Sequence, residues 1–251
     1  MKDIMYNPFS LEGKSILVTG ASSGIGQATA IECSKMGASV IITGRNEQRL
    51  KETFDTLEGA GHSMIIADLT LVDDLQNVVS NTNHIDGLVL CAGKPQTRPI
   101  PFCSRDDFDS VFEINFFSSV ELMRLLLKKK KISKGGSIVF VSSIGGTRAY
   151  GVGNGVYAAS KSAIDAIMKT TANEMGSKNI RVNSVNPGMV NTKLIRGGTI
   201  SEEQLKADSK LYPLQRYGEP KEIAWGIVYL LSDASSWVTG HPLVIDGGRT
   251  I

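Results

Sequence analysis

The feature that most constrains the fold is a regular alternation of short apolar runs with longer amphipathic stretches. The apolar runs are rich in valine and isoleucine, as expected of strands that are buried on both faces. The stretches between them have the length and polarity of helices that cover a sheet. Strands are predicted at 15–19, 39–43, 63–67, 87–91, 137–142, 180–185 and 242–245. Helices are predicted at 24–37, about 46–58, from about 71, about 105–131, near 155–176 and near 219–232.

This alternation predicts an α/β fold of the Rossmann type, with a doubly wound parallel sheet of about seven strands and helices on both faces. The chain of 251 residues shows no repeat, linker or low-complexity tract, so we assign 1–251 to a single domain. Segment 192–216 is polar, carries Gly197 and Gly198, and interrupts the pattern. We therefore expect it to form a lid over a substrate site.

Composition and charge argue against several classes of protein. A formal charge of +2 is too small for a general nucleic-acid binder. The N-terminus lacks an apolar signal core, and no apolar run approaches the roughly 20 residues of a membrane span. Cys33, Cys91 and Cys103 lie far apart and the three histidines are scattered, so we expect neither disulfides nor a metal site. A reducing, cytoplasmic setting is the simplest interpretation.

Three glycines, Gly20, Gly24 and Gly26, stand between the first predicted strand and the first predicted helix. Glycine lets the backbone turn sharply and approach a phosphate with no Cβ in the way. The N-terminus of the helix then offers N–H groups and a partial positive charge to the anion. The placement predicts a dinucleotide phosphate site, and the alternative is a tight turn that holds no ligand.

The same turn also fits the G-x-S-x-G nucleophile elbow of α/β-hydrolases, with Ser22 at the position of the nucleophile. In that fold several strands and an oxyanion loop precede the elbow. Here only 14 residues precede Ser15, and they include no HGGG-like segment. The hydrolase alternative is therefore disfavoured.

Tyr157 and Lys161 are four residues apart in YAASKSAIDAIMK, which is free of glycine and proline. On a helix they share one face, where an ammonium group favours the phenolate form of the tyrosine. Such a phenol can exchange a proton with a substrate oxygen. Tyr217 and Lys221 have the same spacing, but Pro220 disfavours a helix that would include both. An ordinary helix face is the alternative for the first pair.

The residues after the second predicted strand bear on the choice of cofactor. An acidic residue there would bind the ribose 2′-hydroxyl of NAD. This chain has Thr43-Gly44-Arg45-Asn46 instead, and Arg45 can form a charge-assisted bond with a 2′-phosphate. NADP(H) is therefore expected, with NAD(H) less favoured. The alternative is that Arg45 is an ordinary surface arginine.

Taken together, from about Lys14 to Gly248, these motifs resemble the short-chain dehydrogenase/reductase family, whose cofactor turn reads TGxxxGxG. The pattern is most similar to that of bacterial 3-oxoacyl-(acyl-carrier-protein) reductases. In that family a basic residue often stands at the position of Ser23, so Arg45 would be the one cationic partner of a 2′-phosphate. The resemblance implies cofactor contacts at Gly20, Ser22, Ser23, Gly24, Ile25, Gly26, Arg45, Asp68, Leu69, Ala92, Gly93, Tyr157, Lys161, Pro187, Gly188, Val190 and Thr192.

The resemblance also implies a catalytic set of four residues. Tyr157 would donate the proton, and Lys161 would bind the nicotinamide ribose and lower the pKa of the phenol together with the nicotinamide ring. Ser143 would polarise the substrate carbonyl, and it is preferred to Ser142 because its SIGG setting matches the family pattern. Asn115 would anchor a water molecule of the proton relay.

One segment departs from the family pattern. The family's NNAG reads Leu90-Cys91-Ala92-Gly93 here, which removes asparagine hydrogen bonds expected to steady the sheet. Binding of the cofactor through the backbone of Ala92 and Gly93 could survive this change.

Substrate and partners follow from the resemblance only in outline. A small-molecule or carrier-linked ketone is expected, and a homotetramer with helices 105–131 and 155–176 in an interface. An acidic acyl carrier protein is one expected partner, for which a basic run could dock; the alternative is that these lysines only stabilise a helix end. The run comprises Lys128, Lys129, Lys130, Lys131 and Lys134. Two alternatives to an acyl reductase remain. The chain could be a sugar, polyol or steroid dehydrogenase, or a non-catalytic NADP-binding protein.

Overall fold

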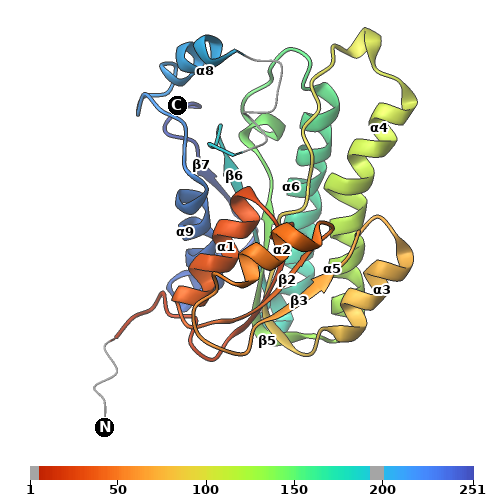
Figure 1. Cartoon of the computed structure of the whole chain (residues 1–251), viewed down its shortest axis with the longest axis vertical. Coiled ribbons are helices and arrows are strands. Elements are labelled where there is room, and N and C mark those ends of the chain that lie inside the picture. Colours follow the sequence, from red (N-terminus) through yellow and green to blue (C-terminus); the bar gives the residue numbers. More distant parts are fainter. Residues whose placement is uncertain (1–5, 193–200) are drawn as a thin grey trace.

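Seven parallel strands form the central sheet of the computed structural model, which describes residues 6–192 and 201–251 (Figure 1). Their order across the sheet is β3-β2-β1-β4-β5-β6-β7, and every neighbouring pair is parallel. The predicted doubly wound α/β fold is therefore confirmed. The strands are β1 (Ser15–Thr19), β2 (Ser39–Gly44), β3 (Ser63–Ile66), β4 (Ile85–Leu90), β5 (Ile132–Val141), β6 (Arg181–Pro187) and β7 (Pro242–Ile245).

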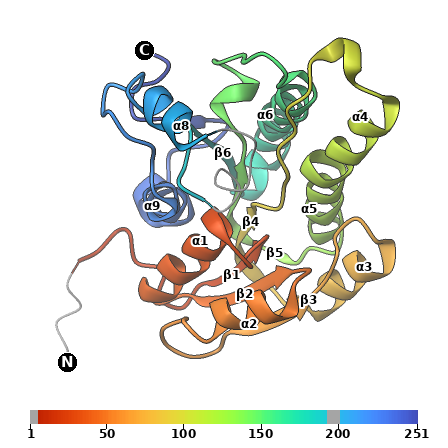
Figure 2. The same ribbon diagram turned by 45° about the horizontal axis from the view of Figure 1, so that its top comes forward.

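Helices connect the strands and cover both faces of the sheet, as Figure 2 shows for α1 and α5 on opposite sides. Within the described ranges, no helix combines the length and apolarity that a membrane span needs. The longer helices are α1 (Gly24–Lys35), α2 (Glu47–Phe54), α3 (Val72–Asn81), α4 (Arg105–Phe112), α5 (Ser118–Lys128), α6 (Gly155–Met175), α8 (Glu202–Ser209) and α9 (Pro220–Leu231). Shorter helical turns are η1 (Ile100–Phe102), η2 (Glu113–Phe117), η3 (Ile144–Gly146), η4 (Gly176–Lys178) and η5 (Asp233–Ser235).

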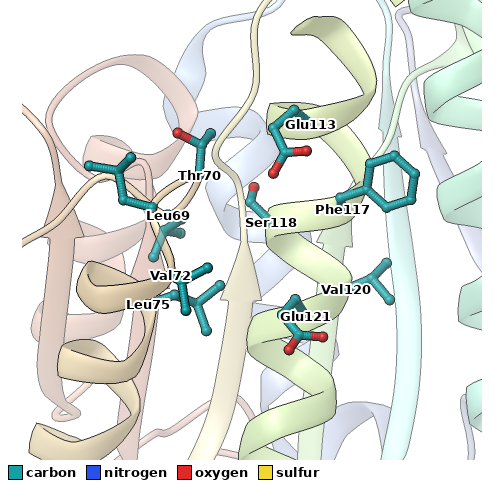
Figure 3. A pocket seen from close by; sticks show the side chains of 10 residues that line it. Leu69, Thr70, Val72, Leu75, Glu113, Phe117, Ser118, Val120 and Glu121 are labelled. Atoms are coloured by element: carbon teal, nitrogen blue, oxygen red, sulfur yellow. The ribbon is translucent and has the colours of Figure 1, made fainter. Parts of the chain in front are cut away.

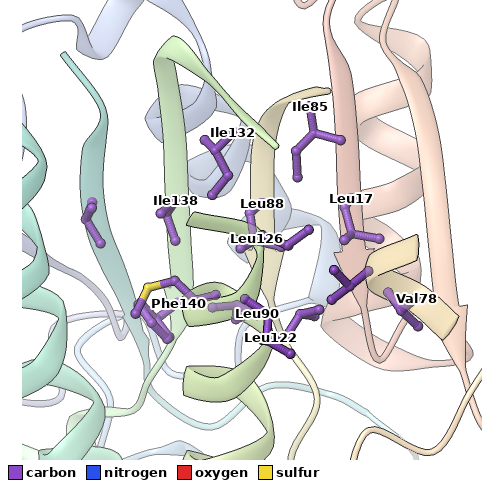
Figure 4. Packing of buried hydrophobic residues seen from close by; sticks show 14 of the residues in the cluster. Leu17, Val78, Ile85, Leu88, Leu90, Leu122, Leu126, Ile132, Ile138 and Phe140 are labelled. Atoms are coloured by element: carbon purple, nitrogen blue, oxygen red, sulfur yellow. The ribbon is translucent and has the colours of Figure 1, made fainter. Parts of the chain in front are cut away.

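Alternate residues of β1, β2, β4, β5 and β6 pack into two separate cores, one on each face of the sheet. Leu17 packs with residues of α3, α5 and α6 on one face, and Figure 4 shows this cluster around Leu88, Leu122 and Phe140. Ile16, from the same strand, packs with residues of α1, α2 and α9 on the other face. Burying one such side chain contributes about 1.5–3 kcal/mol relative to leaving it in water. Both cores hold the carboxyl ends of the strands in fixed positions.

The strand order reverses between β1 and β4, which is where doubly wound folds open a crevice for ligands. The Thr19 hydroxyl accepts hydrogen bonds from the backbone N–H groups of Cys91 (3.0 Å) and Ala92 (3.2 Å). Leu90 is buried in the core instead of carrying a polar side chain. Thr19 therefore links the two strands at the point where the family asparagines are missing.

Strand β5 begins at Ile132 instead of the predicted 137, and two helical segments also differ from the sequence prediction. The single helix predicted over 105–131 is interrupted by η2, a turn of π-helix between α4 and α5. The polar segment 192–216 contains α8, which begins with a reciprocal capping box between Ser201 and Gln204. Residues 193–200 of the predicted lid lie outside the described residues, so the lid itself stays a prediction.

Candidate active site

The three glycines after β1 shape a close-packed turn. Gly20 (φ +64°) and Gly24 (φ +58°) adopt the left-handed backbone conformation that side chains disfavour. A Cβ atom at Gly20 would lie 3.0 Å from the Ala92 backbone, and one at Gly24 would lie 3.2 Å from the Thr192 methyl group. A Cβ atom at Gly26 would lie only 2.4 Å from the Gly20 carbonyl oxygen. Three parts of the chain therefore meet closely around this turn.

The N-terminus of α1 opens from the same turn. Its N-cap residue, Ser23, is extended and makes no side-chain capping bond, so the first-turn N–H groups point outward without a side-chain acceptor from the cap. The Thr53 hydroxyl donates a hydrogen bond to the Ala21 carbonyl at 2.9 Å, and Ile25 packs against the core. Ser22 Oγ lies beside Gly44 at the end of β2. We call this turn and the adjacent N-terminus of α1 the glycine cradle; the missing Cβ atoms at Gly20, Gly24 and Gly26 and the free N–H groups fit the pyrophosphate of a dinucleotide.

Arg45 and Asp68 flank the opposite end of this cradle. Arg45 Nη1 lies 3.4 Å from Asp68 Oδ2, and 63% of the Arg45 side chain is exposed. Burial favours a raised pKa for Asp68, but hydrogen bonds from Thr70 and the charge of Arg45 lower it overall. Asp68 is therefore a fixed carboxylate, and Arg45 is a loosely held cation that can turn toward an anionic ligand.

The structure brings Tyr157, Lys161 and Ser143 together at the carboxyl end of β5. Tyr157 and Lys161 lie on α6, with Lys161 Nζ at 5.9 Å from the centre of the Tyr157 ring. Lys161 is 5% exposed, and its Nζ donates to the Val141 carbonyl at 2.8 Å. Ser143 Oγ and the Tyr157 ring both border Gly145, since a Cβ atom there would lie 3.3 Å from Ser143 Oγ and 3.8 Å from Tyr157 Cε1. The predicted pair thus has the geometry of a phenol beside a hydroxyl and a nearby ammonium.

The electrostatics of this group differ from the prediction in one respect. Burial raises the pKa of Tyr157, and the hydrogen bond with Ser143 only partly opposes this effect. Burial also lowers the pKa of Lys161 to about 8, so the amine is mostly protonated at neutral pH. The protein alone does not make the phenol acidic, because desolvation of Tyr157 outweighs the lowering of its pKa by Ser143. The structure therefore does not show the predicted lowering of the pKa of Tyr157.

The two candidate serines have separate environments. Ser142 is buried, and its hydroxyl donates to the Lys161 carbonyl at 3.1 Å. Ser143 begins η3, where its hydroxyl accepts from the Gly145 N–H at 3.0 Å while facing Tyr157. Ser143 is therefore the serine that is available to a substrate oxygen, as the SIGG pattern favours.

Asn115 lies in the π-helical turn and is 1% exposed. Its side chain accepts from the Lys94 N–H at 2.8 Å and donates to the Lys94 carbonyl at 3.1 Å and to Ser160 Oγ at 3.0 Å. A Cβ atom at Gly93 would lie 3.1 Å from Asn115 Oδ1 and 3.5 Å from Lys161 Nζ. Asn115 thus fixes the loop after β4 against α6, and the absence of a side chain at Gly93 leaves room beside the ammonium.

The segment Pro187–Thr192 leaves β6 and passes over the same edge of the sheet. Gly188 packs against Tyr212, and the Tyr212 hydroxyl accepts from the Met189 N–H at 3.1 Å. Val190 bridges to Gly218. Sequence reasoning missed Tyr212, which is 3% exposed and connects the predicted lid to this segment. No local pattern marks it, because its partner lies 23 residues away.

Two other features lie apart from these residues. The basic run Lys128–Lys131 directly precedes β5, at the edge of the sheet opposite to the end that carries Ser143. A groove of about 270 Å³ lies between α3 and the η2–α5 segment, and its lining includes Val72 and Leu75 on one side and Ser118 and Glu121 on the other (Figure 3). Leu69, a predicted cofactor contact, lines this groove, but no member of the predicted catalytic set does.

Comparisons with known proteins agree on one family. A family model described as Enoyl-(Acyl carrier protein) reductase matches residues 20–250. The chain is 34% identical to the 3-oxoacyl-(acyl-carrier-protein) reductase of Rickettsia prowazekii, over 95% of this chain and 97% of the relative. It is also 34% identical to a glucose 1-dehydrogenase of Gluconobacter oxydans, over 95% and 92%. A solved short-chain dehydrogenase/reductase family protein has a TM-score of 0.85 at 32% identity, covering 96% of this chain and 100% of that chain.

Proposed function

The chain belongs to the short-chain dehydrogenase/reductase family of oxidoreductase enzymes, and we propose that it transfers hydride between NADP(H) and a ketone or secondary alcohol. Members of this family bind a nicotinamide cofactor. The favoured substrate is a 3-oxoacyl thioester carried by an acyl carrier protein. The observation that carries the proposal is the convergence of Tyr157, Ser143 and Lys161 beside the glycine cradle.

Each residue has a separate task in the proposed reduction. The bound cofactor supplies the hydride that the carbonyl carbon accepts. Ser143 donates a hydrogen bond to the carbonyl oxygen and stabilises the negative charge that develops there. Tyr157 transfers its phenolic proton to that oxygen, which completes the alcohol. Lys161 holds a positive charge near the phenolate that remains, and Asn115 fixes the loop that borders the site.

Apolar side chains near the site support an acyl substrate. Loops 94–102 and 147–154 flank the catalytic residues and are joined by the Arg98 N–H, which donates to the Gly153 carbonyl at 2.8 Å. Four large apolar side chains on these loops are mostly exposed, namely Ile100, Phe102, Tyr150 and Val152. An acyl chain would cover such side chains, whereas a sugar would leave them in water.

A sugar or polyol dehydrogenase is the second candidate, because the glucose 1-dehydrogenase is as similar to this chain as the acyl reductase. A steroid dehydrogenase and a non-catalytic NADP-binding protein are further alternatives. NADPH oxidation with an acetoacetyl thioester, and NADP reduction with glucose and gluconate, distinguish these possibilities. We expect turnover of the thioester. Turnover of the sugars alone would replace the acyl proposal, and no turnover of any ketone or alcohol would favour a binding protein.

The preference for NADP(H) is assigned to Arg45. Replacing Arg45 with alanine is expected to weaken NADPH binding by roughly 10–100-fold, since a charge-assisted bond is worth about 1.5–3 kcal/mol. NADH binding is expected to change little. Fluorescence titration with both cofactors measures the effect, and Lys51→Ala is a matched control because Lys51 is similarly exposed. Equal losses for NADPH and NADH would contradict this assignment.

We also propose that the chain forms a homotetramer through the face that η2 and α6 present. Phe117 is 52% exposed, and Ala159 and Ala166 are exposed on α6, so a partner helix could approach closely. The position of the basic run does not support docking of a carrier there. Lys128–Lys131 lie at the amino end of β5, whereas Tyr157 lies near its carboxyl end. A carrier would have to approach the carboxyl ends of the strands instead.

A further inference from the structure

One buried carboxylate lies next to the catalytic residues but outside their motif. Asp165 is 4% exposed and follows Lys161 by one turn of α6. Over 6–192 and 201–251, no ion pair includes this carboxylate. A buried carboxylate without a partner is strongly unfavourable, so neighbouring groups have to stabilise its charge.

Hydrogen bonds from β6 hold this carboxylate in one orientation. Ser184 Oγ donates to Asp165 Oδ1 at 2.7 Å, and Asn186 Nδ2 donates to Asp165 Oδ2 at 2.8 Å. Asn186 Nδ2 also lies 3.4 Å from the Ser143 carbonyl and 3.4 Å from Thr147 Oγ1. A continuous set of polar contacts therefore runs from the catalytic helix to the backbone of Ser143.

The charge of Asp165 acts on Lys161. Burial lowers the pKa of Lys161 to about 8, while Cys91 and Asp165 both act to raise it. Burial raises the pKa of the Cys91 thiol to about 12, so Cys91 is uncharged at neutral pH. Tyr157 is the other titratable group beside the amine, and β5 contributes the Val141 carbonyl. Asp165 is therefore the anion that opposes the desolvation of Lys161.

We propose that Asp165 is a positioning residue that serves as the counter-charge of Lys161 and, through Asn186, holds the backbone of Ser143. The importance of Asp165 for turnover rests on the proposed function. Its electrostatic effect on Lys161 is independent of that function. Asp165 keeps a proton on the buried amine at neutral pH, so that a positive charge stands near Tyr157. The partners from β6 keep the carboxylate in place without neutralising it.

A double-mutant cycle on the cofactor-free protein tests this role. The four proteins are the unaltered chain, Asp165→Asn, Lys161→Met and the double variant, unfolded in urea at pH 7 and near pH 10. At pH 7 we expect Asp165→Asn to reduce the folded-to-unfolded ratio about tenfold more when Lys161 is present than when methionine replaces it. Near pH 10 this coupling should largely disappear, because Lys161 in the folded chain is then neutral.

The sign of the pH effect follows from linkage. Because folding lowers the pKa of Lys161, the folded chain releases this proton first, and this group makes stability rise with pH above about 8. Without the charge of Asp165 the amine loses its proton at lower pH, so that rise should begin earlier in Asp165→Asn. The buried thiols of Cys33 and Cys91 have raised pKa values, so they make stability fall as the pH rises above the ordinary pKa of a thiol. All four proteins contain both thiols, so this contribution cancels in the double-mutant cycle.

A structural role alone would give a different result. Ser137→Ala is the control, since Ser137 is also buried and donates to the Leu230 carbonyl at 2.7 Å near the opposite edge of the sheet. Its destabilisation should be the same in the unaltered chain and in the Lys161→Met variant. If Asp165→Asn does not fold, Asp165→Ser takes its place. Coupling that is absent at pH 7, or equal at both pH values, would overturn the proposal. Neither result depends on turnover, so a failure of the proposed function would be seen separately.

Discussion

Replacing Tyr157 with phenylalanine is expected to abolish turnover while NADPH binding stays nearly unchanged. The variant removes one hydroxyl, the proposed proton donor, which lies near Ser143. Loss of a positioned general acid reduces rates by about 10²–10⁴-fold. The ring itself remains, together with its position 5.9 Å from Lys161 Nζ, so the surroundings of the cradle are preserved.

The measurement combines steady-state NADPH oxidation on a ketone with fluorescence titration of NADPH. Tyr229→Phe is the matched control, because Tyr229 lies on α9 and packs against Phe9, away from the site. We expect it to keep both activity and binding. If Tyr157→Phe turned over at the rate of the unaltered chain, the assignment of the acid would be wrong. Parallel loss of binding and turnover would instead point to a role in holding the cofactor.

The sheet could be predicted from sequence because its central strands are buried on both faces. Short, continuous runs of β-branched and apolar residues such as SILVT and SIVFVS are typical of such buried strands. The first residues of β5 were missed, because Lys134, Gly135 and Gly136 interrupt its apolar run. Tyr157 and Lys161 could be paired because one helical turn separates them, which is a local property of the chain.

The remaining features depend on contacts between distant residues. The π-helical turn around Asn115 changes the helical period only locally, and its side-chain bonds to Lys94 span 21 residues. Asp165 resembles an ordinary polar helix residue until β6 places Ser184 and Asn186 against it. The raised pKa of Tyr157 was missed for a similar reason, since spacing reveals the neighbouring amine but not the depth of burial.

Gly26 is expected to be as important for NADPH binding as Tyr157 is for the proposed turnover. In an open position of a helix, replacing glycine with alanine stabilises a protein by about 1 kcal/mol. At Gly26 the new Cβ would lie 2.4 Å from the Gly20 carbonyl oxygen and 3.1 Å from the Thr19 carbonyl oxygen. Both are backbone atoms at the end of β1, so α1 has to move away from the strand. Gly26→Ala is therefore expected to destabilise the protein instead of stabilising it.

Gly26→Ala should weaken NADPH binding by at least about 100-fold and destabilise the fold by about 1–3 kcal/mol, the range for overpacked sites. Because α1 and the Gly20 turn form the two sides of the cradle, their separation moves the N–H groups away from the phosphates. Calorimetric titration on the folded protein and urea unfolding without cofactor measure the two effects independently. Gly176→Ala is the control, since its Cβ would meet nothing within 4 Å. Tight NADPH binding by Gly26→Ala would show that the cofactor does not depend on the close approach of α1 to β1.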